Sequence, residues 1–199
     1  MLCSQLQPQR KYVLVVGLEG SGKTTFLYGP RLKPGWEQAK YESTLGYNYE
    51  EIRFSSGILA VFDTPGKDAL FPIVKNLYKN LAISGLIFVF KLSNRAIDFI
   101  TAKRRLKFLA NEPEFKGCIL VIIGNNAIGN VSVGNDAAGN IRVEVESQFK
   151  DPAYLENALG LEDFKHNELR KLFVYDVKYA PKESEIVWRW LSENIPNDD

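Results

Sequence analysis

The sequence has almost no excess of charge of one sign and no long hydrophobic run. Its 199 residues include 25 Lys and Arg against 24 Asp and Glu, for a net charge of +1. This near balance gives no reason to expect binding to nucleic acid or to anionic lipid. Its apolar stretches are broken well short of the ~18–20 residues of a membrane-spanning helix, so no transmembrane segment is expected. Two cysteines do not make a disulfide framework, and Leu2 stands where an N-myristoylation signal needs Gly.

Short apolar runs alternate with helical patterns along the chain. The apolar runs are nearly continuous, which is typical of strands that are covered on both faces in a parallel sheet. They are Tyr12–Gly17, Ile58–Asp63, Gly85–Phe90, Cys118–Gly124 and Leu172–Val177. Helix candidates begin near Gly22, Asp68, Arg95, Pro152 and Lys182. Tyr49–Phe54 is expected to pair antiparallel with Ile58–Phe62 as an edge strand. The alternation predicts an α/β fold of three layers, with helices on both faces of a mostly parallel six-stranded sheet that has one antiparallel edge strand.

The last helix candidate has a clear apolar face. Ile186, Val187, Trp190 and Leu191 recur at helical spacing, which predicts that this face packs against the sheet.

One polar stretch interrupts the alternation of predicted strands and helices. Gly129–Asn140, with the sequence GNVSVGNDAAGN, is rich in Gly and Asn and is predicted to form a loop. Ile141, Val143 and Val145 then alternate with charged or polar residues, as the side chains of a half-exposed strand do.

The strongest chemical signal is the segment Gly17–Thr24, with the sequence GLEGSGKT, which lies directly between a predicted strand and a predicted helix. It fits the phosphate-binding loop GxxxxGK[ST] in the context that this motif requires. Backbone N–H groups of such a loop surround phosphate oxygens, Lys23 places an ammonium on the outer phosphates, and Thr24 offers a hydroxyl to Mg²⁺. The residues expected to contact phosphate are Glu19, Gly20, Ser21, Gly22, Lys23, Thr24 and Thr25.

A second signal follows at Asp63-Thr64-Pro65-Gly66, at the end of a predicted strand. Alone, this sequence is an ordinary turn. Some forty residues after a phosphate-binding loop, it indicates an Asp63 that holds the Mg²⁺ shell and a Gly66 N–H that meets the terminal phosphate. The turn also argues against a P-loop kinase, which would not need it.

The segment Thr44–Asn48 (TLGYN) is similar to switch I of the ADP-ribosylation-factor-like (ARF-like) small GTPases of the Ras superfamily. Gly46–Asn80 can be laid on the family pattern without a gap, and further matches occur at Gly85–Val89, Leu155–Phe164 and Trp190–Ser192. The chain therefore resembles this family over most of its length. The resemblance implies a small G-protein domain over residues 11–196, with tails at 1–10 and 197–199 and an insertion at about 129–151.

The resemblance also implies the ligands and the partners of this domain. The expected cofactors are GTP or GDP, with ATP possible, and Mg²⁺. The implied metal ligands are Thr24, Thr44 and Asp63, and the implied nucleotide contacts beyond the phosphate-binding loop are Thr44, Gly66, Asn125, Asn126 and Lys178. A protein effector or a multi-subunit assembly is expected to bind through the switch regions and the insertion. An intracellular protein, cytoplasmic or organelle-associated, is implied.

The sequence departs from the family pattern both where the family has its residue for hydrolysis and where it has its residues for guanine. Lys67 stands where the family has the Gln that positions the attacking water, and a protonated amine cannot accept that water's hydrogen bond. The guanine signature NKxD is replaced by Asn125-Asn126-Ala127-Ile128. Loss of the acidic acceptor at Ile128 removes about 3–6 kcal/mol of hydrogen bonding, or about a hundred- to ten-thousandfold in affinity. The last base-contacting loop, near Val177-Lys178-Tyr179, is also off the pattern.

Three functions remain open. The preferred hypothesis is a pseudo-GTPase, a structural or adaptor subunit that binds a purine nucleotide with Mg²⁺ and hydrolyses it very slowly or not at all. The alternative is a working GTP/GDP switch that recruits effectors in membrane or organelle trafficking. A P-loop kinase-like enzyme is the least favoured, because the family match runs through both switches.

Overall fold

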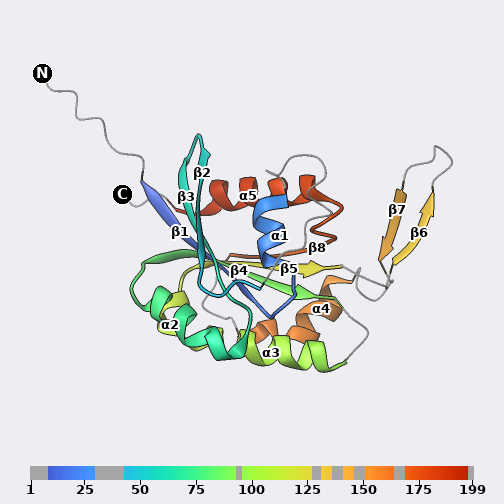
Figure 1. Ribbon diagram of the computed structural model, residues 1–199, viewed down its shortest axis with the longest axis horizontal. Coiled ribbons are helices and arrows are strands. Elements are labelled where there is room, and N and C mark those ends of the chain that lie inside the picture. Colours follow the sequence, from blue (N-terminus) through green and yellow to red (C-terminus); the bar gives the residue numbers. More distant parts are fainter. Residues whose placement is uncertain are drawn as a thin grey trace, which may run out of the picture.

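A six-stranded sheet forms the centre of the computed structural model (Figure 1). Its strands lie in the order β2 (Asn48–Phe54), β3 (Gly57–Asp63), β1 (Arg10–Gly17), β4 (Ile83–Lys91), β5 (Ile119–Asn125) and β8 (Arg170–Tyr175). All neighbours pair in parallel except β2, which runs antiparallel to β3 at the edge. The sheet and its antiparallel edge strand confirm the predicted fold. The structure describes residues 9–29, 43–92, 96–126, 131–135, 141–145, 151–163 and 169–196.

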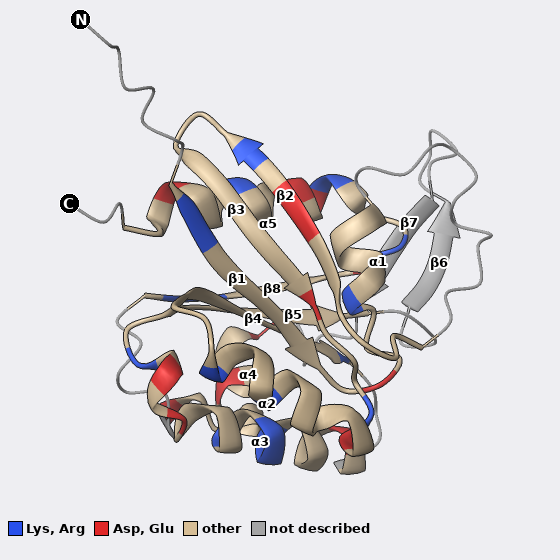
Figure 2. Ribbon diagram, turned by 60° about the vertical axis from the view of Figure 1, so that its left-hand side comes forward, with Lys and Arg blue, Asp and Glu red and all other residues tan. Residues whose placement is uncertain are grey.

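Helices cover both faces of the sheet (Figure 1). On one face lie α1 (Lys23–Tyr28) and α5 (Pro181–Asn194), and on the other lie α2 (Phe71–Lys79), α3 (Ala96–Ala110) and α4 (Pro152–Leu159). Short 3₁₀ turns occur at η3 (Asp68–Leu70), η4 (Pro113–Phe115) and η6 (Leu161–Asp163). Acidic and basic residues are interspersed over these elements (Figure 2). None of the helices in the described ranges is long and apolar enough to cross a membrane.

The sheet separates two hydrophobic cores because successive residues of a strand point to opposite faces. Leu14 and Val16 of β1 belong to the core under α2, α3 and α4. Val13 and Val15 of the same strand belong to the core under α1 and α5. All four are at most 3% exposed, which explains why this part of β1 does not alternate between polar and apolar residues.

The predicted apolar face of α5 is partly wrong. Val187 and Leu191 are fully buried as expected, but Ile186 is 51% exposed and Trp188 is only 1% exposed. The Trp188 ring stacks on Phe26 of α1 with centroids 4.6 Å apart. This large buried ring sets the rotation of the helix and turns Ile186 to the surface.

The predicted loop over Gly129–Asn140 is also wrong in part. Residues Val131–Asn135 form strand β6, which pairs antiparallel with β7 (Ile141–Val145) in a separate two-stranded sheet. The backbone register joins Val131 to Val145 and Val133 to Val143, so pairing with the predicted strand overrides the Gly- and Asn-rich composition. The rest of the proposed insertion at 129–151 lies mostly outside the described residues, and its partner contacts remain a prediction.

Replacing Trp188 by Ala is expected to destabilise the protein by about 3–5 kcal/mol, because it leaves a large cavity beside Phe26. Ile186→Ala, on the exposed side of the same helix, is the matched control and should change stability by less than about 0.5 kcal/mol. Urea denaturation followed by circular dichroism measures both. Equal losses for the two variants would contradict the packing of α5 described above.

Candidate functional site

The predicted phosphate-binding loop joins the carboxyl end of β1 to the N-terminus of α1. It turns through left-handed backbone at Gly20 (φ 67°) and Gly22 (φ 95°), a conformation that favours glycine. Space is also restricted at Gly22, where an added Cβ would lie 2.4 Å from Nδ2 of Asn125. The glycines of the motif are therefore required by the loop's shape and by its neighbours.

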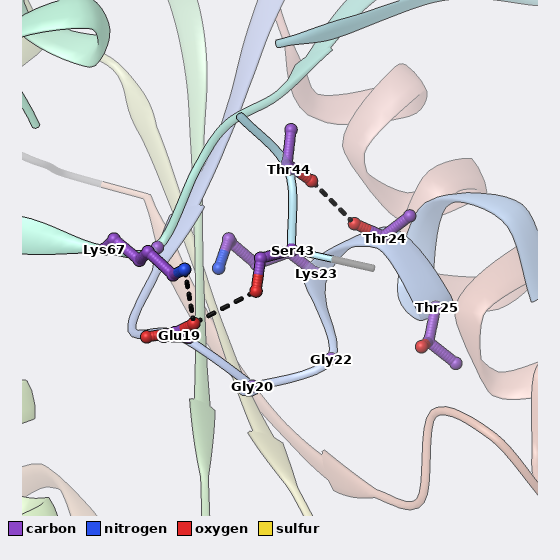
Figure 3. A pocket seen from close by; sticks show the side chains of 10 residues that line it. Glu19, Gly20, Gly22, Lys23, Thr24, Thr25, Ser43, Thr44 and Lys67 are labelled. Carbon is purple, nitrogen blue, oxygen red and sulfur yellow. Dashed lines mark hydrogen bonds and ion pairs between the residues drawn. The ribbon is translucent and has the colours of Figure 1, made fainter. Parts of the chain in front are cut away.

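This loop lines a cavity of about 170 Å³ together with segments from elsewhere in the chain. Figure 3 shows the side chains around it. The lining residues are Glu19, Gly20, Gly22, Lys23, Thr24, Thr25, Ser43, Thr44, Gly66 and Lys67. The structure thus brings together the three segments that the sequence predicted: the loop, the TLGYN segment and the turn after β3. Ser43 was not predicted, and its place beside Thr44 was the available signal.

Lys23 lies beneath the loop with only 6% of its surface exposed. Its Nζ donates a hydrogen bond to the carbonyl oxygen of Leu18 at 2.8 Å. Burial lowers the pKa of Lys23 to about 8, while the nearby Asp63 carboxylate acts in the opposite direction. An ammonium has three donors and desolvation disfavours its charge, so an anion bound in the loop would stabilise it.

Oxygen atoms gather beside Lys23 in the arrangement that was predicted for a Mg²⁺ site. Asp63 Oδ2 accepts hydrogen bonds from Thr24 Oγ1 at 2.7 Å and from Asn48 Nδ2 at 3.1 Å. Thr44 Oγ1 lies 3.4 Å from Thr24 Oγ1. Asp63 Oδ1 is buried and accepts no hydrogen bond from the residues that the structure describes. Burial raises the pKa of the Asp63 carboxyl, against the effect of its hydrogen bonds to Thr24 and Asn48.

This donor set fits the implied cofactor. Hydroxyl and carboxylate oxygens are hard ligands of the kind that Mg²⁺ takes together with phosphate oxygens. The orphaned Oδ1 of Asp63 and the desolvated ammonium of Lys23 are the groups that a Mg²⁺–phosphate ligand would satisfy. The assignment of Thr24, Thr44 and Asp63 as metal ligands remains a prediction.

Lys67 lies at the mouth of the cavity, where it pairs with the loop itself. Its Nζ is 3.5 Å from Glu19 Oε1, and the same oxygen accepts a hydrogen bond from Ser43 Oγ at 3.0 Å. Gly66, the residue before Lys67, packs directly on the loop, since an added Cβ would lie 2.5 Å from the backbone N of Glu19. The sequence predicted neither contact of the Glu19 side chain.

Comparison with known proteins agrees with this geometry. The model of the ADP-ribosylation factor family matches residues 1–140. The chain belongs to the ADP-ribosylation factor family. Its fold is also similar to that of the Arl6 BBS3 small GTPase from Trypanosoma brucei, solved with a bound nucleotide analogue, GppNp. That likeness has a TM-score of 0.67 at 19% identity and covers 94% of this chain and 100% of the other, which supports the fold alone.

In this ADP-ribosylation factor family protein, the residues at the position of the guanine signature follow β5, and Asn125 and Asn126 differ in their hydrogen bonds. Asn125 donates from Nδ2 to the Ser21 carbonyl at 2.9 Å and accepts at Oδ1 from the Val177 N–H at 3.2 Å. Its side chain therefore ties the phosphate-binding loop to the loop after β8. Asn126 is 1% exposed, and neither atom of its amide has a partner within the described ranges. Ile128, at the position of the family's Asp, lies outside the described residues.

The loop after β8 is held by a residue that the sequence did not predict. Asp176 Oδ1 accepts hydrogen bonds from the backbone N–H groups of Lys178 at 2.8 Å and Tyr179 at 3.1 Å. The signal was available, because an Asp directly after a strand commonly folds back on the N–H two residues later. The Lys178 side chain lies over the Tyr179 ring, with Nζ 5.2 Å from its centre, and its contact with a nucleotide remains a prediction.

An aromatic cluster lies on the exposed surface between the two switches. The rings of Tyr47 and Tyr49 pack on Phe62, with centroids 5.6 Å and 5.1 Å apart. Tyr47 is nevertheless 51% exposed and Tyr49 44% exposed. Exposed aromatic side chains of this size are typical anchors of protein interfaces.

We expect Lys23→Ala to abolish retention of Mg²⁺–nucleotide, because it removes the only ammonium beneath the loop within the described residues. Lys171→Ala, on the exposed surface of β8, is the control for loss of one lysine and should leave retention unchanged. The measurement is equilibrium binding of a fluorescent guanine nucleotide with Mg²⁺ at up to millimolar concentration. Equal binding by wild type and Lys23→Ala would contradict the assignment of the loop.

Proposed function

We propose that this ADP-ribosylation factor family protein binds a purine nucleotide with Mg²⁺ but hydrolyses it very slowly or not at all. It then acts as a pseudo-GTPase, a structural or adaptor subunit of a protein complex. The observation that carries the proposal is the contrast within one cavity. Lys23 and Thr24, with Asp63 bonded to Thr24, have the chemistry that phosphate and metal need, whereas Lys67, paired with Glu19, stands where hydrolysis needs a water-positioning Gln.

The chemistry of the amine supports slow hydrolysis. Small GTPases that have their Gln hydrolyse GTP unaided at only on the order of 10⁻⁴ per second, because the protein merely orients the water and stabilises charge. A lysine donates hydrogen bonds and accepts none. Asp68, the next carboxylate along the chain, is engaged by Arg105 of α3 and does not line the cavity. A cation near the terminal phosphate would hold the triphosphate in its ground state.

A second candidate function is a GTP/GDP switch that recruits effectors in membrane or organelle trafficking. The exposed aromatic rings of Tyr47, within the TLGYN segment, and of Tyr49, just after it, favour binding of a protein partner there. A partner at this surface, and further contacts through residues 129–151, fit both candidate functions. Hydrolysis is what separates the switch from the pseudo-GTPase.

Lys67→Gln is expected to raise single-turnover GTP hydrolysis above that of the wild type, because it restores a side chain that accepts a hydrogen bond from water. Rapid mixing with radiolabelled GTP, followed by quenching, measures the rate. Lys75→Gln on α2, which does not line the cavity, is the control and should change nothing. A lower rate in Lys67→Gln than in a measurable wild type would make Lys67 catalytic and favour the working switch.

Guanine selectivity is expected to be weak, because Ile128 offers an apolar side chain where the family has a carboxylate. Competition of GTP against ATP and ITP should give a preference for GTP over ATP well below a thousandfold. Ile128→Asp is expected to increase this preference by restoring the acceptor for the guanine ring. A wild-type preference above a thousandfold would show that another acceptor reads the base.

A further inference from the structure

One carboxylate of the phosphate-binding loop contacts both switch segments. Glu19 Oε1 accepts the Ser43 hydroxyl at 3.0 Å, next to Thr44 of switch I. The same oxygen lies 3.5 Å from Lys67 Nζ, next to Gly66 of switch II. Figure 3 shows both interactions converging on Glu19 at the edge of the cavity.

In GTPases generally, the switch segments are ordered by contacts with the γ-phosphate and Mg²⁺ and are released after hydrolysis. In this chain both segments rest on the loop through groups of the protein. Thr44 approaches Thr24 at 3.4 Å between their hydroxyl oxygens, and Gly66 packs on the backbone of Leu18 and Glu19. Both switch segments are therefore held against the loop by contacts within the protein itself.

We propose that the Glu19 carboxylate takes the place of a γ-phosphate in holding the two switches. The diphosphate-bound protein then keeps the same closed switches as the triphosphate-bound protein. The inference rests on the proposed function, because it assumes that a nucleotide binds. It deepens that function by making the switch conformation independent of whether the nucleotide carries two or three phosphates. It makes Glu19 a positioning residue for the switches.

The chemistry of Glu19 suits this role. A carboxylate, like a phosphate, is an anion that accepts hydrogen bonds from an ammonium and a hydroxyl. It is covalently part of the loop, so it does not leave when a terminal phosphate is hydrolysed. The side chains of Lys67 and Glu19 are 43% and 54% exposed, so the ion pair alone shifts the equilibrium only about two- to fivefold. Keeping the two switch segments against the loop therefore depends on the hydroxyl of Ser43 and the packing of Gly66 together with this ion pair.

The test is amide hydrogen exchange of residues 43–48 and 64–70 in the full chain, with Mg²⁺ and either GDP or the non-hydrolysable analogue GppNHp. In the wild type the two nucleotides should give the same exchange within about twofold. In Glu19→Gln, which keeps the shape of the side chain and removes its charge, both segments should exchange about two- to fivefold faster with GDP, the share that an exposed ion pair contributes. GppNHp should restore the protection, because its γ-phosphate replaces the missing anion.

The controls keep the result specific to Glu19. Glu51→Gln removes a partly exposed carboxylate that pairs with Arg10 and Arg53 outside the cavity, and it should leave exchange of both segments unchanged. If Glu19→Gln does not fold, the double variant Ser43→Ala/Lys67→Gln removes the same contacts from the other side and should open both segments with GDP. Wild-type segments that exchange more than about twofold faster with GDP than with GppNHp would overturn the proposal, as would a Glu19→Gln variant that exchanges no faster than the wild type with GDP.

The failure of this inference is distinguishable from that of the proposed function. Direct titration with fluorescent GDP and GppNHp decides whether a nucleotide binds at all. If neither binds, the proposed function fails, and the exchange comparison is made without nucleotide. Faster exchange in Glu19→Gln than in the wild type then still supports the role of Glu19, and equal exchange overturns it.

Discussion

The side chain of Asn125 fixes the geometry on which the rest of the site depends. It lies at the carboxyl end of β5, is 1% exposed, and bonds at one end to the Ser21 carbonyl and at the other to the Val177 N–H. Both ends of this buried amide are therefore paired, as buried polar groups need to be. The close approach leaves no room for a Cβ at Gly22, so the loop, the sheet and the segment after β8 are held as one unit.

This unit positions the residues at the carboxyl ends of the strands. Parallel strands bring their carboxyl ends to one edge of the sheet, which places Asp63 and Asn125 at the same edge as the phosphate-binding loop after β1. Burial at that edge lowers the pKa of Lys23 to about 8, a cost that an anionic ligand relieves.

Lys67 and Glu19, which both line the cavity, compensate each other's charge. A lysine at the position of the catalytic Gln would bring an unpaired cation to the mouth of the loop. Here Glu19 pairs with it, and Ser43 completes the contact. The arrangement fits the proposal that this protein holds its switches in place. The aromatic surface of Tyr47 and Tyr49 then remains available to a partner.

The sequence by itself determined the strands, the phosphate-binding loop and the family. Continuous apolar runs such as those of β1 and β5 are typical of strands covered on both faces, and the glycines at 20 and 22 suit a left-handed loop. Tertiary structure alone decided the rotation of α5, where the stacking of Trp188 on Phe26 places Ile186 at the surface. It also decided the strand β6, which exists through its pairing with β7. The meeting of Ser43 and Lys67 at Glu19 was decided in the same way, because residues far apart in the chain come within hydrogen-bond distance only after the sheet has positioned their loops.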